Sequence, residues 1–81
     1  MILDLKLFAK AKDLAGTDSL AVELPEGATV GDLRTQLHEL YPAMSPFIHN
    51  LLISVGTDYA QDSQPLSPNV EVACFPPVSG G

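Results

Sequence analysis

Residues 29–42 read TVGDLRTQLHELYP, and here the spacing of apolar residues changes from that of a strand to that of a helix. The apolar side chains recur every three or four residues and so share one helix face: Val30, Leu33, Leu37 and Leu40. Thr29 and Asp32 fit the capping pattern that begins a helix. Pro42 ends it, because the residue before a proline avoids the α region. The stretch predicts one amphipathic helix.

The segments on both sides of this helix alternate in polarity, as strands do. Before it, residues 2–9 (ILDLKLFA) and 20–24 (LAVEL) place every second side chain on one face. The turn-forming AGTD at 15–18 separates them, so we expect an antiparallel hairpin. After the helix come three further predicted strands: residues 51–55, 59–61 (a brief edge strand) and 70–75.

This order of elements predicts an α+β fold in which a curled mixed sheet packs on one main helix. The first and last strands can lie side by side and parallel, as in the β-grasp architecture of ubiquitin-like proteins. A ferredoxin-like sheet, the alternative, would need a second proper helix. We expect residues 1–75 to form the β-grasp domain and residues 76–81 to leave it as an extended, flexible tail.

The composition limits the classes of function. The chain has 81 residues, enough for one domain, and a formal net charge of −6, from ten acidic and four basic residues. We expect no nucleic-acid binding, which requires a basic surface. The acidity favours either solubility alone or attraction to a basic protein surface. No stretch resembles a signal peptide or a membrane span, so we expect a soluble, cytoplasmic protein without membrane contact.

The sequence contains one cysteine and two histidines. A lone cysteine excludes an internal disulfide, and with two distant histidines it does not make a metal site. Cys74 points inward by the alternation of its strand, so we interpret it as a core residue and not as a sulfur carrier. Neither His38 nor His49 has a carboxylate or cysteine at a catalytic spacing. We expect no bound cofactor or metal.

Two aromatic residues occupy strand positions that otherwise carry charged side chains, namely Phe8 and Phe75. If the first and last strands are neighbours, the two rings share one exposed patch, which is typical of a partner-binding surface. The alternative is that a loop covers this part of the sheet.

The sequence ends with FPPVSGG (75–81). Pro76 and Pro77 lack N–H donors and favour an extended exit from the sheet. Six residues from Pro76 span up to about 20 Å, enough to enter the active site of another protein. Gly80 and Gly81 have no Cβ, so they fit a narrow channel and leave the terminal carboxylate accessible. Two terminal glycines also occur by chance, but here they agree with the predicted fold.

The chain resembles the MoaD family, the small subunits of molybdopterin synthase. The resemblance rests on residues 7–18, 29–37 and 62–81, and its most specific part is FPPVSGG (75–81). It implies a β-grasp fold and a terminal Gly81 that an E1-like adenylyltransferase activates with ATP. A sulfur donor then converts Gly81 to a thiocarboxylate. The tail enters the large catalytic subunit and gives its sulfur to cyclic pyranopterin monophosphate, forming the molybdopterin dithiolene.

The resemblance also implies partners and contact residues. Two small and two large subunits form a heterotetramer, and Gly80 and Gly81 carry the chemistry. The implied partner-binding residues are Phe8, Lys12, Tyr59, Phe75, Pro76, Pro77, Val78 and Ser79. Two positions depart from the family pattern, because Cys74 stands where an aromatic residue is common and Gly56 where asparagine is frequent.

Three other functions stay open from the sequence. One is a ubiquitin-like modifier that is joined to lysines of other proteins. Another is a sulfur carrier for a different pathway, such as thiamine, cysteine or tungsten-cofactor synthesis, although the double proline favours molybdopterin over thiamine. The third is an interaction module with an inert tail.

Overall fold

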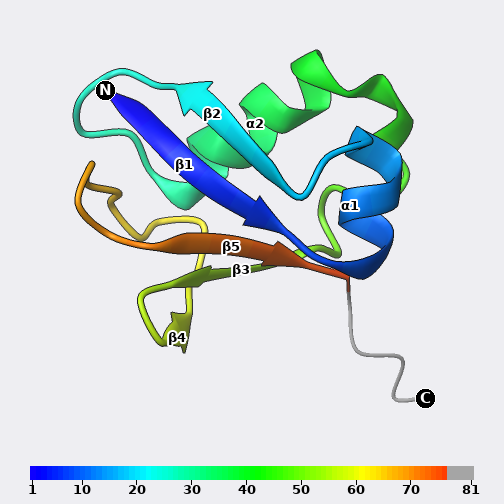
Figure 1. Ribbon diagram of the computed structural model, residues 1–81. Helices are drawn as coiled ribbons and strands as arrows, with labels where there is room; N and C mark the ends of the chain where they lie inside the picture. Colours follow the sequence, from blue (N-terminus) through cyan, green and yellow to red (C-terminus); the bar gives the residue numbers. More distant parts are fainter. Residues whose placement is uncertain (77–81) are drawn as a thin grey trace.

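In the computed structural model, which describes residues 1–76, five strands form one mixed sheet and helix α2 packs on one face of it (Figure 1). The elements follow in the order β1 (Ile2–Leu7), α1 (Ala9–Ala15), β2 (Ser19–Glu23), α2 (Val30–Leu40), the 3-10 helix η1 (Pro42–Met44), β3 (Leu52–Val55), β4 (Asp58–Tyr59) and β5 (Val72–Phe75). Residues 77–81, which hold most of the predicted tail, lie outside the described residues.

The first and last strands meet at the centre of the sheet. The strand order is β2-β1-β5-β3-β4. β1 and β5 are parallel, with Leu5 opposite Val72 and Leu7 opposite Cys74. The other neighbours are antiparallel. The predicted α+β fold, with a mixed sheet and a parallel central pair, is therefore confirmed.

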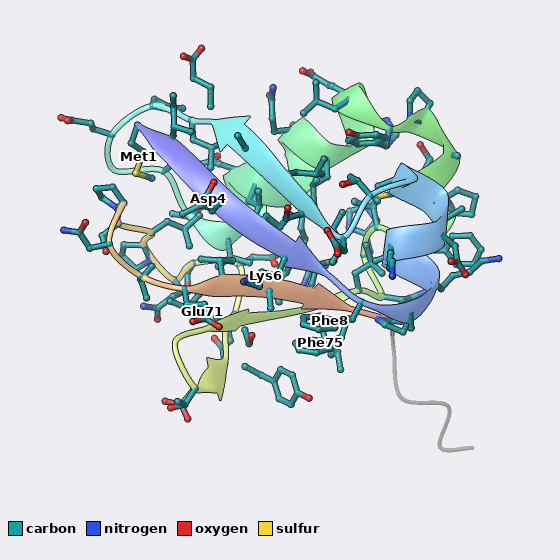
Figure 2. The ribbon with its side chains drawn as sticks, in the orientation of Figure 1. Met1, Asp4, Lys6, Phe8, Glu71 and Phe75 are labelled. Carbon is teal, nitrogen blue, oxygen red and sulfur yellow. The ribbon has the colours of Figure 1, made fainter. Side chains whose placement is uncertain are left out.

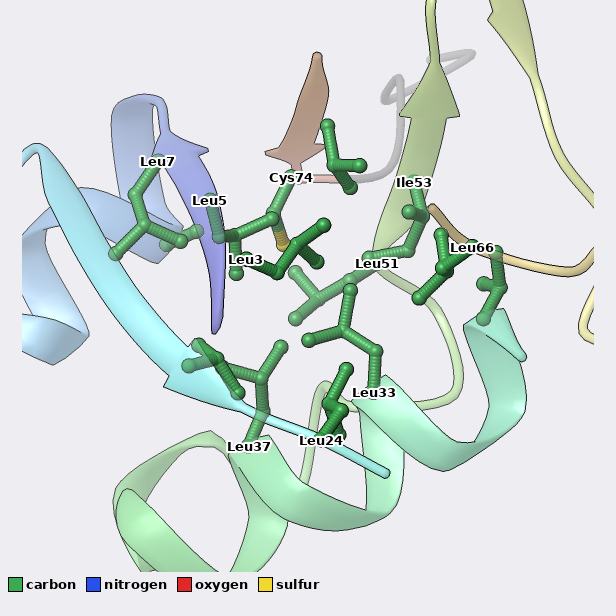
Figure 3. Close-up of a cluster of buried hydrophobic side chains, with 14 of the residues drawn as sticks. Leu3, Leu5, Leu7, Leu24, Leu33, Leu37, Leu51, Ile53, Leu66 and Cys74 are labelled. Carbon is green, nitrogen blue, oxygen red and sulfur yellow. The ribbon is translucent and has the colours of Figure 1, made fainter. Parts of the chain in front are cut away.

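The core lies between this sheet and α2 (Figure 3). Alternate β1 side chains, those of Leu3, Leu5 and Leu7, are buried, as the predicted alternation requires. They pack in one apolar cluster with the buried side of α2, which consists of Val30, Leu33 and Leu37. No polar or charged residue among residues 1–76 is classed as buried. The core is therefore built by burial of aliphatic side chains.

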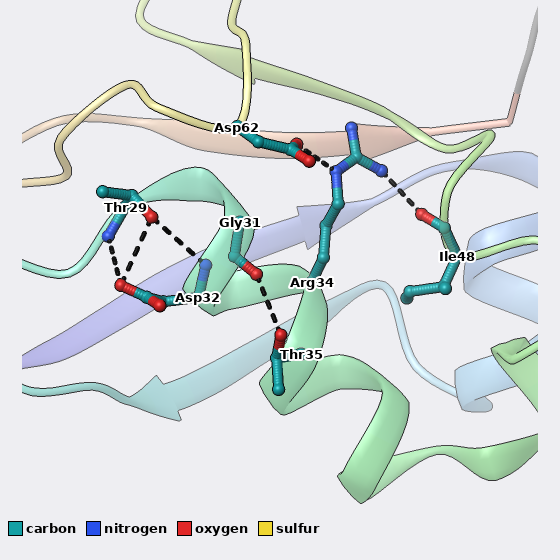
Figure 4. Close-up of polar contacts among 7 residues, drawn as sticks. All are labelled: Thr29, Gly31, Asp32, Arg34, Thr35, Ile48 and Asp62. Carbon is teal, nitrogen blue, oxygen red and sulfur yellow. Dashed lines mark hydrogen bonds and ion pairs between the residues drawn. The ribbon is translucent and has the colours of Figure 1, made fainter.

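Helix α2 begins and ends where the sequence predicts. The Thr29 hydroxyl accepts a hydrogen bond from the Asp32 N–H at 3.3 Å, and an Asp32 carboxylate oxygen accepts one from the Thr29 N–H at 2.9 Å (Figure 4). These two bonds form a complete capping box. The helix ends at Leu40, two residues before Pro42, which opens η1. The capping prediction is confirmed.

The structure corrects the prediction for residues 9–18. β1 ends at Leu7, and the following residues form the helix α1 instead of a strand end and a turn. The sequence AKAKDLA consists mostly of strong helix formers, and Gly16 ends the helix in a left-handed conformation with φ 75°. β1 and β2 pair as predicted, but a helix and not a tight turn connects them. The protein therefore has a second helix, α1, in addition to the main helix α2.

The other strands are shorter than predicted or shifted. β3 begins one residue later than residue 51, β4 covers 58–59 instead of 59–61, and β5 begins at 72 instead of 70. Ala73 lies on the face of β5 opposite to that of Val72 and Cys74, yet it is buried as well. Its methyl group is short and lies in a central strand, between neighbours on β1 and β3.

The loop after β4 is bound to the first turn of α2. The N–H groups of Val30 and Gly31 donate to the carbonyls of Gln64 and Asp62, each at 2.9 Å. Helix N–H groups at these positions have no partner within the helix, so the loop satisfies them. Arg34 completes the contact: its Nε donates to Asp62 at 2.7 Å and its Nη1 to the Ile48 carbonyl at 2.6 Å (Figure 4).

This contact predicts an unusual effect of Gly31→Ala. In an open helix the change adds about 1 kcal/mol of stability. Here a Cβ would lie 3.3 Å from both the Cβ and the carbonyl oxygen of Asp62. Because Arg34 and the Gly31 N–H both hold Asp62 in place, we expect the change to lower the free energy of unfolding by about 1 kcal/mol. Urea unfolding measures it, and a gain in stability would contradict the account.

Candidate functional site

Three aromatic side chains lie together where the described chain ends. The rings of Phe8 and Phe75 are stacked, with centroids 4.8 Å apart and planes 5° from parallel (Figure 2). The Tyr59 ring meets Phe75 edge-on, at 6.3 Å and 89°. We call these three residues the aromatic patch. The prediction that Phe8 and Phe75 lie side by side is confirmed, and Tyr59 joins them.

The pairing of β1 with β5 explains why the two phenylalanines meet. Leu7 lies opposite Cys74, and both side chains are buried. The next residue of each segment therefore points to the other face of the sheet. The Phe8 N–H donates to the Cys74 carbonyl at 3.1 Å, which continues the pairing by one step. Because the buried residues Leu7 and Cys74 lie opposite each other, the rings of Phe8 and Phe75 meet on the outer face.

The backbone is strained directly after Phe8. Ala9 has φ 51°, and within residues 1–76 it is the one non-glycine residue with a positive φ. This conformation costs an alanine about 1–2 kcal/mol. It turns the chain from β1 into α1, where the Phe8 carbonyl accepts a hydrogen bond from the Ala11 N–H at 3.1 Å. Such strain is typical of functional positions, and here it lies beside the patch.

The aromatic patch is open to solvent. The exposed fraction is 44% for Phe8 and 67% for Tyr59, while Phe75 and Pro76 are half-buried. The alternative that a loop covers this part of the sheet is therefore wrong for the described residues. Pro76 continues from β5 beside the patch. The other predicted tail residues, Pro77, Val78, Ser79, Gly80 and Gly81, lie outside the described residues, so their roles stay predictions.

A groove adjoins the patch on the side of α1. It has a volume of about 430 Å³, and Lys6, Phe8, Lys12, Asp18 and Ser19 contribute to its lining. Lys12 thus lies near Phe8, where a partner contact is predicted. Sequence reasoning missed Lys6. Its place on the outer side of β1 follows from the alternation of that strand. The groove itself could not be predicted, because α1, which forms one of its walls, was not expected from the sequence.

Cys74 lies in the core and outside this site. Its side chain is fully buried, as predicted. Burial raises the pKa of the Cys74 thiol from 9.0 to about 11, and the positive charge of Arg34 offsets this only in part. Thiolate is the reactive form of cysteine, so Cys74 is inert at neutral pH.

The two histidines lie elsewhere on the surface. His38 Nδ1 is 2.8 Å from the Ser45 hydroxyl, and both histidines line a cavity of about 300 Å³ beside Arg34. Over the described residues, His, Cys, Asp and Glu form no group of three that could hold a metal. Within the same part of the chain, no helix is both long and apolar enough to cross a membrane.

The raised pKa predicts slow labelling of Cys74. Two pKa units mean about a hundredfold less thiolate at pH 8 than in the unfolded chain. We therefore expect an alkylating reagent to label the native protein at least about a hundredfold more slowly than the protein in urea. The same pKa shift makes stability depend on pH. Because the Cys74 thiol ionises at lower pH in the unfolded chain than in the folded one, the free energy of unfolding falls as pH rises from 9 to about 11. Equal labelling rates in both states would contradict the buried position.

A parallel β1–β5 pair, one main helix over the sheet and an aromatic patch beside the C-terminal strand define a ubiquitin-like protein of the β-grasp class. The sequence model described as the ThiS family matches residues 5–81. The chain therefore belongs to the ThiS family.

Individual relatives agree with this family. The chain is 37% identical over 78 residues to a molybdopterin synthase sulfur carrier subunit of Dictyostelium discoideum, covering 93% of this chain and 91% of that protein. Among solved structures it is similar to a putative molybdopterin converting factor, subunit 1, of Pyrococcus furiosus, with TM-score 0.85, 29% identity and coverage of 96% and 99%.

Two further solved structures share the fold. SAMP1 of Haloferax volcanii matches with TM-score 0.84 and 29% identity over the whole of both chains. A chain in a complex of subunits 1 and 2 of the molybdopterin-converting factor of Helicobacter pylori matches with TM-score 0.70. At 18% identity, with both chains fully covered, the second likeness concerns the fold alone.

Proposed function

We propose that this chain is the sulfur-carrier small subunit of a molybdopterin synthase. The observation that carries the proposal is the exposed aromatic patch beside Pro76, from which the sequence continues to Gly80 and Gly81. An apolar surface at the base of such a tail can bind the enzyme that receives the tail. The likeness to the Dictyostelium sulfur carrier subunit supports the same role.

In this proposal the carried sulfur is bound at Gly81. A carboxylate is a poor electrophile, so an E1-like adenylyltransferase joins it to AMP, and pyrophosphate leaves ATP. A sulfur donor at the oxidation level of hydrosulfide then attacks the acyl carbon, and AMP departs. The product is a thiocarboxylate, a better nucleophile than the carboxylate. This chain supplies the tail and its docking surface, and consumes no cofactor of its own.

The chemistry of Cys74 supports a terminal sulfur. A cysteine that carried sulfur would need an accessible thiolate. Cys74 is buried, and its pKa is raised to about 11. By contrast, a tail of six residues from Pro76 reaches up to about 20 Å into a partner. The terminal carboxylate is thus the better candidate of the two.

The acceptor in this proposal is cyclic pyranopterin monophosphate in the large catalytic subunit, where two sulfur transfers form the molybdopterin dithiolene. Two small and two large subunits assemble, in the cytoplasm. Phe8, Tyr59, Phe75 and Lys12 contact the large subunit, and the tail from Pro76 to Gly81 enters its active site. The Helicobacter structure, a complex of subunits 1 and 2 of the molybdopterin-converting factor, is a precedent for this fold in a complex of two such subunits.

Reconstitution tests this function. The chain is prepared with a thiocarboxylate at Gly81 and mixed with a molybdopterin synthase large subunit and cyclic pyranopterin monophosphate. We expect the dithiolene product by mass spectrometry, and none from the same chain with an ordinary carboxylate. If no product forms while an authentic small subunit succeeds with that large subunit, the proposal is wrong.

The likeness to SAMP1 favours a second function. A second similar crystal structure from Haloferax volcanii is that of small archaeal modifier protein 1, the name that SAMP1 abbreviates. In a modifier, a lysine amine attacks the same acyl adenylate, AMP leaves, and an isopeptide bond joins Gly81 to the target. Adducts of higher mass that need the activating enzyme would support this function. Both functions use the same tail, so one does not exclude the other.

A further inference from the structure

All three lysines of the chain lie within residues 6–12, where β1 leads into α1. Lys6 is on β1, and Lys10 and Lys12 are on α1; all three are exposed. Within residues 1–76 the one ion pair is that of Arg34 with Asp62, so none of these lysines is paired. Three cations that have no ion-pair partner among residues 1–76 thus lie within seven residues of a chain whose net charge is −6.

Two of these lysines line the groove next to the patch. Lys6 enters it from β1, Lys12 from α1, and Asp18 and Ser19 from the chain at the start of β2. The walls are fixed by the backbone: Lys6 pairs with Ser19, and the Leu7 N–H donates to the Asp18 carbonyl at 2.9 Å. The groove lining therefore carries two positive charges against one carboxylate.

The groove and the aromatic patch are continuous. Phe8 belongs to both, because it stacks on Phe75 and also lines the groove. Figure 2 shows Lys6 on β1, on the same side of the sheet as Phe8 and Phe75. A partner that covers the patch will therefore also cover the groove. Covering an unpaired ammonium group removes its water, which is unfavourable unless the partner supplies an acceptor.

We propose that the groove receives a carboxylate side chain of the large subunit, bound between Lys6 and Lys12. This inference rests on the proposed function and names the chemistry of its docking partner. The net charge of the chain favours a basic partner, whereas the excess of lysine in the groove lining favours an acidic group at this one place. In this proposal Lys6 is a residue that recognises the large subunit. Lys10 is not part of the groove, and its Nζ lies 6.0 Å from the centre of the Phe47 ring.

Lys6→Gln and Lys10→Gln form a matched pair of variants, since each removes one charge from an exposed lysine. Binding of the full chain to the purified large subunit is measured at low and at high salt. We expect Lys6→Gln to weaken binding about two- to tenfold at low salt and to reduce the salt dependence. Lys10→Gln should bind like the wild type. Lys6→Arg, which keeps the charge, should retain most of the affinity.

The outcomes separate the two proposals. Equal affinities of Lys6→Gln and Lys10→Gln overturn the inference while leaving the proposed function intact. Lys6→Arg binding as weakly as Lys6→Gln also overturns it, because charge would not be the cause. Failure of the wild type to bind any synthase large subunit refutes the proposed function, and this inference with it. Unfolding midpoints of all variants show that each is folded.

Discussion

Removing Gly81 is expected to abolish sulfur transfer while leaving the fold intact. The deletion makes Gly80 the terminus and withdraws the carboxylate by about 3.5 Å. A misplacement of only 1 Å in a bound reactant can reduce a rate about a hundredfold, so activation of the shortened tail should fall below detection. Within residues 1–76 the last member of the core cluster is Cys74, and glycine has no side chain, so the deletion removes none of the described core. Thiocarboxylate formation and urea unfolding measure the two effects.

Ser79→Thr is the matched control for this deletion. It changes the same tail but keeps its length and both glycines. We expect normal thiocarboxylate formation from this variant. If the Gly81 deletion transferred sulfur as well as Ser79→Thr does, the terminal glycine would not carry the sulfur, and the proposed function would be wrong.

Replacing Phe8 by alanine is expected to weaken binding of the large subunit about 30-fold or more. Aromatic residues at the centre of an interface often contribute at least 2 kcal/mol to binding. Phe8 is 44% exposed and its ring stacks on that of Phe75, so alanine removes one of the two stacked rings. The cost to stability should be smaller, about 1 kcal/mol, because one stacked pair is lost and the core is unchanged. Calorimetric titration measures the affinity.

Phe47→Ala provides the control for this change. Phe47 is also an exposed phenylalanine, 37% accessible, but it lies beside Lys10 and is not part of the aromatic patch. Its loss should leave the affinity within about twofold of the wild type, the usual range for residues outside a hot spot. An equal loss of affinity in both variants would show that exposed aromatic area in general, and not the patch, governs binding.

The parts of the fold that were predictable are those with a local signal. The spacing of Val30, Leu33 and Leu37 determines which side of α2 is buried, and alternation does the same for β1. Helix α1 was missed because its apolar side is small: Ala11 is its one buried residue, and Leu14 and Ala15 are only partly buried against the core. Its signal was helix propensity and the following Gly16, which are weak evidence in a segment of seven residues.

The candidate site was predictable only in part, because its remaining contacts join distant residues. Phe8 and Phe75 could be paired once the first and last strands were taken as neighbours. Outside the site, the Arg34–Asp62 ion pair spans 28 residues and in the same way depends on where the loop after β4 lies. The groove beside Lys6 requires α1, the start of β2 and β1 together. No periodicity in the sequence records such an arrangement.

The most direct test of the central claim is the intact mass of the protein after incubation with ATP, an E1-like activating enzyme and a sulfur source. The account predicts an ATP-dependent gain of ~16 Da, one oxygen replaced by sulfur, which fragmentation places on Gly81. Oxidation of either of the two methionines adds a similar mass, so the position and the ATP dependence decide the result. No gain at Gly81, with an enzyme active on its own carrier, would contradict the account.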